Sequence, residues 1–220
     1  MKRFVFILLF CFLQANSVFA ENYFYKFWHS RVLHFAQKHL PEVEKLSETE
    51  KQDFFKTDEY KSVAILLYEF IEPKRASKRY FDTSHALSKS LLKSKGFGHV
   101  INHFKKQKSH FDSLSMPFEL LDYRYVMSPR KGYGSITKQT LFSIKEHIRL
   151  ACRPNITQLF LGSYLASVSP LEGSWVSVKI ENVTSRNSLF LHIPSSISKP
   201  NMFGSVEQEF NLVVNLDEFK

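Results

Sequence analysis

The stretch FGSVEQEFNLVV, residues 203–214, decides the fold of this 220-residue chain. A β-strand is expected over residues 208–216, and Glu207-Gln208-Glu209 stands at its opening. Successive side chains on a strand point to opposite faces, so Glu207 and Glu209 should project from the same face of a sheet. The C-terminal end of the chain is therefore predicted to be a strand that carries two carboxylates side by side.

Further strands are expected on the N-terminal side of this segment. Residues 120–126 alternate apolar and polar side chains, as in Leu121-Asp122-Tyr123-Arg124. After Pro154 the chain is β-rich, and clusters of Gly, Pro, Ser and Asn separate three more candidate strands, over 156–165, 175–180 and 188–193. An amphipathic helix over 138–151 lies between the first strand and the others.

The first half of the chain predicts helices. The first contains Phe24 and Phe35 and ends near Pro41, and Ser47-x-x-Glu50 is a capping box for the second. The expected helices that follow are one capped by Thr57, with an apolar face over 63–70 and its end at Pro73, one over 83–95 ended by Gly96, and one over 99–106. Helices followed by strands predict an α+β domain, with a helical region over 21–118 and a β-rich core over 119–220.

The first twenty residues predict a secretory signal peptide. Lys2 and Arg3 precede an unbroken apolar run over 4–13, and Val18 and Ala20 suit the −3 and −1 positions of a cleavage site. The run is too short to span a bilayer, which takes roughly 20 residues. We expect the mature protein to begin at Glu21, to be secreted or periplasmic, and to lack a transmembrane segment.

Charge and cysteine content limit the partners of the mature chain. Removing Lys2 and Arg3 from the 30 basic residues leaves 28 against 21 acidic ones, a net charge of +7. The densest basic run, around residues 74–79, accompanies no nucleic-acid-binding motif, and export separates the chain from the nucleic acid of its own cell. Cys152 is the single cysteine left after cleavage, so the core and not a disulfide must hold the fold.

Several weaker motifs have a structural interpretation. His99 and His103 share one helical face but lack a third ligand, so no metal site is expected. Two glycosylation sequons begin at Asn155 and Asn182, and they are relevant only in a eukaryotic source.

One group of residues combines the parts of a site for cleaving the nicotinamide–ribose bond of NAD. Arg124 offers a planar fork for a phosphate, and Ser167 and Ser169 offer hydroxyls at the end of a strand. Glu207 and Glu209 supply paired carboxylates, which suit an oxocarbenium-like transition state. The same residue types are also common on solvated faces of sheets, where they form ordinary ion pairs.

These motifs resemble the mono-ADP-ribosyltransferases of the arginine-serine-glutamate class, which includes cholera-toxin-like bacterial toxins. LDYRYV (121–126) is similar to the family's aromatic-Arg strand, and YLASVSP (164–170) to its Ser-Thr-Ser strand, with Val168 in place of Thr. FGSVEQEFNLVV (203–214) is similar to the Glu-x-Glu loop and strand. The likeness extends from about residue 61 to 219, although the chain ends soon after Glu209, where closing strands are expected.

The resemblance implies a role for each residue of the group. Arg124 would hold a phosphate of NAD, Ser167 would orient Arg124 and Glu209, and Ser169 would support it. Glu209 would stabilise the positive charge at the anomeric carbon, and Glu207 would position an arginine of a target protein. The implied function is a secreted toxin or effector that transfers ADP-ribose from NAD, without a metal. One of the two glutamates is expected to have a raised pKa.

Two other functions are compatible with the sequence. One is a secreted, β-rich binding module without catalysis, and the other is a degenerate transferase that keeps the fold as a scaffold. The placement of Arg124, Ser167 and Glu209 discriminates between them. The transferase needs the three residues in one cleft, whereas a binding module does not.

Overall fold

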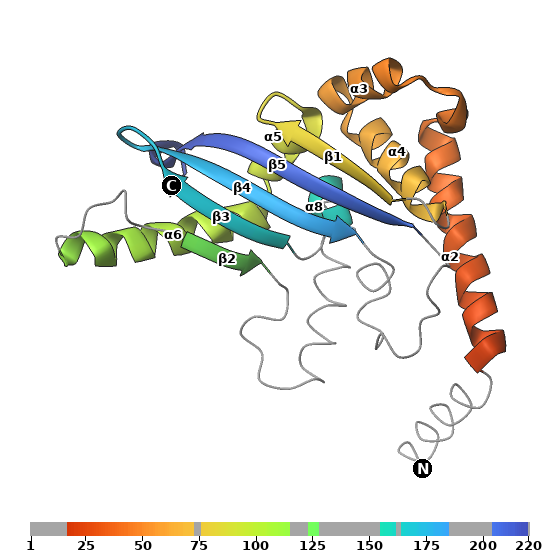
Figure 1. The fold of residues 1–220 in the computed structure, drawn as a ribbon, viewed down its shortest axis with the longest axis horizontal. Coiled ribbons are helices and arrows are strands. Elements are labelled where there is room, and N and C mark those ends of the chain that lie inside the picture. The colour runs from red at the N-terminus through yellow and green to blue at the C-terminus, as the bar shows by residue number, and fades with distance from the viewer. Residues whose placement is uncertain are drawn as a thin grey trace, which may run out of the picture.

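The computed structural model describes residues 17–72, 76–114, 123–127, 155–161, 164–184 and 204–219. Its centre is a mixed five-stranded sheet in the order β1-β5-β4-β3-β2 (Figure 1). The strands are β1 (Ala76–Asp82), β2 (Tyr123–Met127), β3 (Tyr164–Pro170), β4 (Trp175–Thr184) and β5 (Ser205–Asn215). β1 pairs with β5 in parallel, and the other neighbours are antiparallel. The segment that includes the two glutamates is thus an inner strand.

Helices cover one face of this sheet. The α-helices are α2 (Ser17–His39), α3 (Glu48–Thr57), α4 (Glu59–Ile71), α5 (Ala86–Leu92), α6 (Lys95–Ser113) and α8 (Ile156–Leu161), and short 3₁₀ turns lie at Val43–Lys45 and Leu216–Glu218. Figure 1 shows α4, α5, α6 and α8 on the same side of the strands, with α2 packed on α4. The fold is α+β, as the sequence predicts.

The core lies between the sheet and these helices. Every second residue of β4 and β5 is buried, including Val178, Ile180, Phe210 and Leu212. Phe210 packs against Phe81 of β1, with ring centroids 4.9 Å apart. This period of two leaves the alternate residues on the face away from the helices. We call that side of the sheet the open face.

The helix predictions are partly confirmed. Ser47 and Glu50 form the capping box, since the Ser47 Oγ accepts from the Glu50 amide and the Glu50 carboxylate accepts from the Ser47 amide. Thr57 does not cap α4, because it is the last residue of α3. Asp58 is the cap, and its Oδ1 accepts from the Lys61 amide at 2.9 Å.

The helix predicted over residues 83–95 is confirmed only for its middle part, and its predicted end at Gly96 is wrong. The chain forms α5, turns, and starts α6 at Lys95, with Ser94 as its N-cap. Gly96 therefore opens a helix and does not end one. A Cβ at Gly96 would lie 2.1 Å from the Gln158 side-chain nitrogen, and the Gly96 amide donates to Gln158 Oε1. A close approach from α8, not a helix stop, explains this glycine.

The strand predicted over residues 156–165 is also wrong at its start. Residues 156–161 form α8, because Asn155 accepts from the Gln158 amide and acts as a helix cap. The strand begins later, as β3. Strands expected over 120–126, 175–180 and 208–216 correspond to β2, β4 and β5 with shifted or longer bounds. The predicted helix over 138–151 and strand over 188–193 lie outside the described residues.

The sequence prediction missed β1, which lies inside the expected helical region. The buried Glu69 of α4 holds it in place, because Glu69 accepts hydrogen bonds from Arg79 and Ser77 of β1. Arg79 also bonds Glu48 of α3 at 2.7 Å. These side-chain bonds fasten the edge strand to the helical layer.

Candidate functional site

All five residues of the candidate NAD site lie on the open face. Arg124, Ser169 and Glu207 are exposed, and Ser167 and Glu209 are half-buried, whereas their strand neighbours Tyr123, Val168 and Gln208 are buried on the helical side. The expectation that Glu207 and Glu209 share a face agrees with this alternation. The structure thus brings together side chains from β2, β3 and β5.

The register of the sheet sets how near these residues come to one another. Arg124 of β2 lies directly opposite Ser167 of β3, but β4 separates Ser167 from β5. The cross-strand neighbour of Ser167 on β4 is Lys179, which in turn faces Asn211. Two strand spacings put Asn211 about 10 Å from Ser167, and Glu209 lies two residues further along β5, so the backbones of Ser167 and Glu209 are about 12 Å apart. Arg124 and Ser167 are therefore direct cross-strand neighbours, whereas Lys179 on β4 lies between them and the strand that carries the two glutamates.

Glu209 is engaged by two lysines. Its Oε2 lies 3.6 Å from Lys78 Nζ and 3.6 Å from Lys179 Nζ, and its Oε1 accepts from the Asn211 amide group at 3.2 Å. Partial burial raises the pKa of Glu209, but the Asn211 hydrogen bond and the two lysine charges outweigh it, so the pKa lies below its ordinary value. For Glu209, the expectation of a raised pKa is wrong because the lysines favour the carboxylate.

Sequence reasoning missed Lys78, Tyr80 and Lys179 as members of this face. Lys179 Nζ also binds Glu181 at 2.8 Å, and Lys78 lies over the Tyr80 ring at 5.0 Å. The alternation of inward and outward side chains along β1 and β4 could have placed these three residues on one face. In β1 the neighbouring basic run obscured this pattern. The open face therefore carries alternating charges, Lys78–Glu209–Lys179–Glu181.

Large apolar side chains accompany these charges. Four of the seven exposed large hydrophobic residues in the described part of the chain lie on the open face. They are Tyr80 (59% exposed), Trp175 (45%), Val183 (52%) and Val213 (49%). Single exposed apolar residues are ordinary, but several on one face indicate an interaction surface.

The remaining motifs take part in internal contacts. The His103 Nδ1 lies 2.7 Å from the Tyr123 hydroxyl, so this imidazole joins α6 to β2. Of the two sequon asparagines, Asn155 donates to the Ser90 carbonyl and buried Asn182 donates to Gln208. Within the described ranges, no three His, Cys, Asp or Glu side chains cluster as metal ligands would.

No helix in the described part of the chain is long and apolar enough to cross a membrane. The expected cleavage point after Ala20 falls in the first turn of α2, and processing there stays a prediction. The chain matches no protein-family model, no curated protein and no solved structure.

Proposed function

We propose that the chain is a non-catalytic binding module whose open face docks a protein partner. The observation that carries this proposal is the presence of Tyr80, Trp175, Val183 and Val213, all exposed, on the same face as a ladder of paired charges. Protein interfaces combine aromatic and aliphatic anchors with polar groups in this way. The predicted signal peptide places the proposed partner outside the cytoplasm in which the chain is made.

The electrostatics of Glu209 favour binding over catalysis. A carboxylate stabilises an oxocarbenium ion through its unbalanced negative charge. Glu209 lies 3.6 Å from each of two ammonium groups, which balance that charge and would repel a cation at the anomeric carbon. A charge ladder of this kind instead suits the recognition of a partner with complementary charges.

Site-specific photo-crosslinking tests the docking face. A photoreactive residue replaces Val183 or Val213 on the open face, and, as a matched control, Leu114, which is 56% exposed at the end of α6. We expect the two open-face probes to give the same adduct in cells that export the chain, and the Leu114 probe to give none. An adduct from Leu114 with none from the open face would overturn the proposal.

An arginine-specific mono-ADP-ribosyltransferase is a second candidate function. It is favoured by the direct pairing of Arg124 with Ser167, and by the placement of both residues on the same face as Glu207 and Glu209. In this proposal Arg124 binds an NAD phosphate, Ser167 braces the nicotinamide ribose with support from Ser169, and Glu209 stabilises the developing cation. Glu207 positions the guanidinium of a target protein, and NAD is the substrate.

Measurement of NAD turnover by the purified mature chain separates the two proposals. The binding module turns over no NAD. The transferase does, and its Glu209→Gln variant should lose turnover by on the order of 10²–10³-fold while the melting temperature stays constant. Glu207→Gln should then lose transfer to arginine but keep some NAD hydrolysis, because water can still attack the oxocarbenium. Binding of NAD without turnover would identify a degenerate scaffold.

A further inference from the structure

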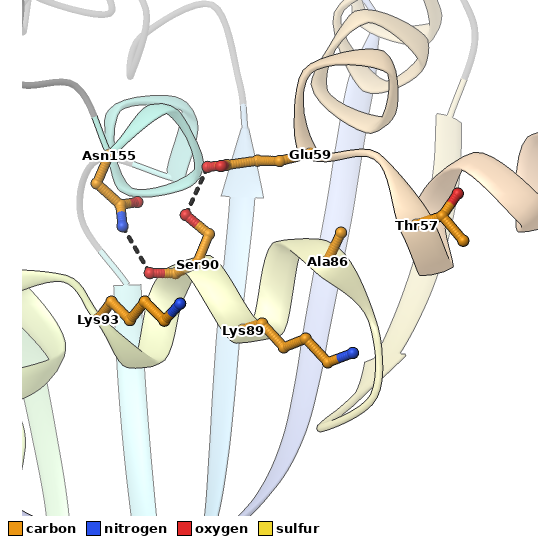
Figure 2. Close-up of a pocket in the computed structure, with 7 residues that line it drawn as sticks. All are labelled: Thr57, Glu59, Ala86, Lys89, Ser90, Lys93 and Asn155. Atoms are coloured by element: carbon orange, nitrogen blue, oxygen red, sulfur yellow. Dashed lines mark hydrogen bonds between the residues drawn. The ribbon is translucent and has the colours of Figure 1, made fainter.

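A hollow of about 390 Å³ lies in the helical layer, on the opposite side of the sheet from the open face (Figure 2). Its walls come from the end of α3, the first turn of α4, α5 and the residue that precedes α8. Of its seven lining residues, six are polar or charged, and Ala86 is the apolar one. The volume of the hollow lies within the range of small-molecule sites.

The polar groups at the floor of the hollow bind one another. The Glu59 Oε1 accepts from the Ser90 hydroxyl at 2.5 Å, and from the Thr157 hydroxyl and amide at 2.9 and 3.2 Å. The Asn155 Nδ2 donates to the Ser90 carbonyl at 2.6 Å, as the dashed lines in Figure 2 show. These bonds join α4, α5 and α8 at the floor of the hollow, and the Glu59 carboxylate already accepts from three donors.

Two lysines at the hollow have no such partners. Lys89 on α5 and Lys93, the C-cap that follows the last residue of α5, are both exposed (Figure 2). Among the residues that the structure describes, neither ammonium has a hydrogen bond or an ion pair, whereas Lys45, Lys51 and Lys108 each bind a nearby carboxylate. The two ammonium charges repel each other, and an anion held between them removes that repulsion.

We propose that Lys89 and Lys93 bind the phosphate group of a phosphorylated small molecule in this hollow. Two ammonium groups match the double negative charge of a phosphate monoester, and lysine binds phosphate as a point charge that tolerates varied geometry. The volume exceeds that of a phosphate alone and leaves room for an attached group of sugar size. The Ser90 and Asn155 side chains at the floor offer polar contacts to that group.

Titration of the full chain with glucose 6-phosphate, followed by phosphorus NMR and calorimetry, tests the site. We expect saturable binding that weakens as salt concentration rises, and no binding of glucose itself. Lys89→Gln with Lys93→Gln should weaken binding by about tenfold or more, because each ammonium–phosphate contact is charge-assisted. Lys38→Gln with Lys106→Gln removes the same charge from exposed positions away from the hollow, and it should leave the affinity unchanged.

A charge-preserving variant separates a site from a general effect of net charge. Lys89→Arg with Lys93→Arg keeps both cations and should keep affinity within a few-fold of the wild type. The proposal is overturned if the wild type shows no saturable binding. It is also overturned if the glutamine pair at the hollow and the glutamine pair elsewhere bind equally well.

Discussion

Lys78 and Arg79 are neighbours on β1, yet they meet opposite surroundings on the two faces of the sheet. Arg79 points to the helical side, where its partner Glu69 is 1% exposed. Lys78 points to the open face, where its side chain is 45% exposed and lies 3.6 Å from Glu209. The two pairs contain the same kinds of charge. The two pairs differ in their exposure to solvent. The buried ion pair holds the fold together, whereas the exposed one remains available to a binding partner.

Breaking the buried pair should have the largest effect. Arg79→Leu leaves the Glu69 carboxylate buried without its main partner, and such changes cost about 3–5 kcal/mol of unfolding free energy. Urea unfolding measures the loss. Arg79→Leu combined with Glu69→Leu should be less destabilised than Arg79→Leu alone, because no charge remains buried. Lys78→Leu is the matched change on the open face, and a loss of equal size there would remove the distinction between the faces.

Gln208 and Glu207, which are adjacent on β5, allow the two faces to be compared without burying a charge. The Gln208 side chain is buried and accepts hydrogen bonds from Asn182 and Thr184 at 2.6 and 3.2 Å, whereas Glu207 is exposed. Gln208→Ala should cost about 1–3 kcal/mol, because the buried Thr184 hydroxyl loses its acceptor and Asn182 keeps only its longer bond to Thr184. Glu207→Ala should change stability by no more than about 0.5 kcal/mol. Thermal unfolding of both variants checks the contrast, which fails if the two melting temperatures fall together.

Acid should weaken the link between β1 and α3. The Arg79 hydrogen bond, with help from Lys51, lowers the pKa of Glu48 to about 2. A lowered folded-state pKa gives stability that is present above about pH 4.5 and is lost as the pH falls toward 2. The Glu48 side chain is 61% exposed, so solvent screening limits the effect to about 1 kcal/mol or less.

Glu48→Gln provides the control for this pH dependence. Unfolding of the wild type and the variant is compared at pH 7, 4.5 and 2.5. We expect the difference at pH 7 to shrink toward the lowest pH, because the folded-state carboxylate begins to take up a proton there and a protonated glutamate resembles glutamine. A constant difference across this range would contradict the assignment.

The smallest effect is expected on the open face. Lys179→Ala removes one of the two lysines of Glu209 and the ion pair with Glu181, but Lys179 is 43% exposed. Exposed pairs contribute little, so the unfolding free energy should change by about 0.5 kcal/mol or less. The crosslinking yield from a probe at Val213 should nevertheless fall if the charge ladder guides a partner. Unchanged yield in a folded variant would exclude Lys179 from docking.

The sequence by itself determined the elements whose signals are local. The capping box at Ser47 depends on residues three apart, and the strand character of β2, β4 and β5 depends on neighbouring side chains. Export is a prediction of the same local kind, since it rests on the first twenty residues. The presence of Glu207 and Glu209 on one face also follows from alternation along the strand.

Only the tertiary structure decided which residues are neighbours across the sheet. No local pattern places β4 between Ser167 and Glu209, or brings Lys78 from the first half of the chain to Glu209 on β5. Strand order and burial arise from contacts between distant segments, such as Arg79 with Glu69 and Gly96 with Gln158. These contacts also place Lys78 and Lys179 beside Glu209, and a carboxylate takes its properties from the charges and the water that the fold places around it.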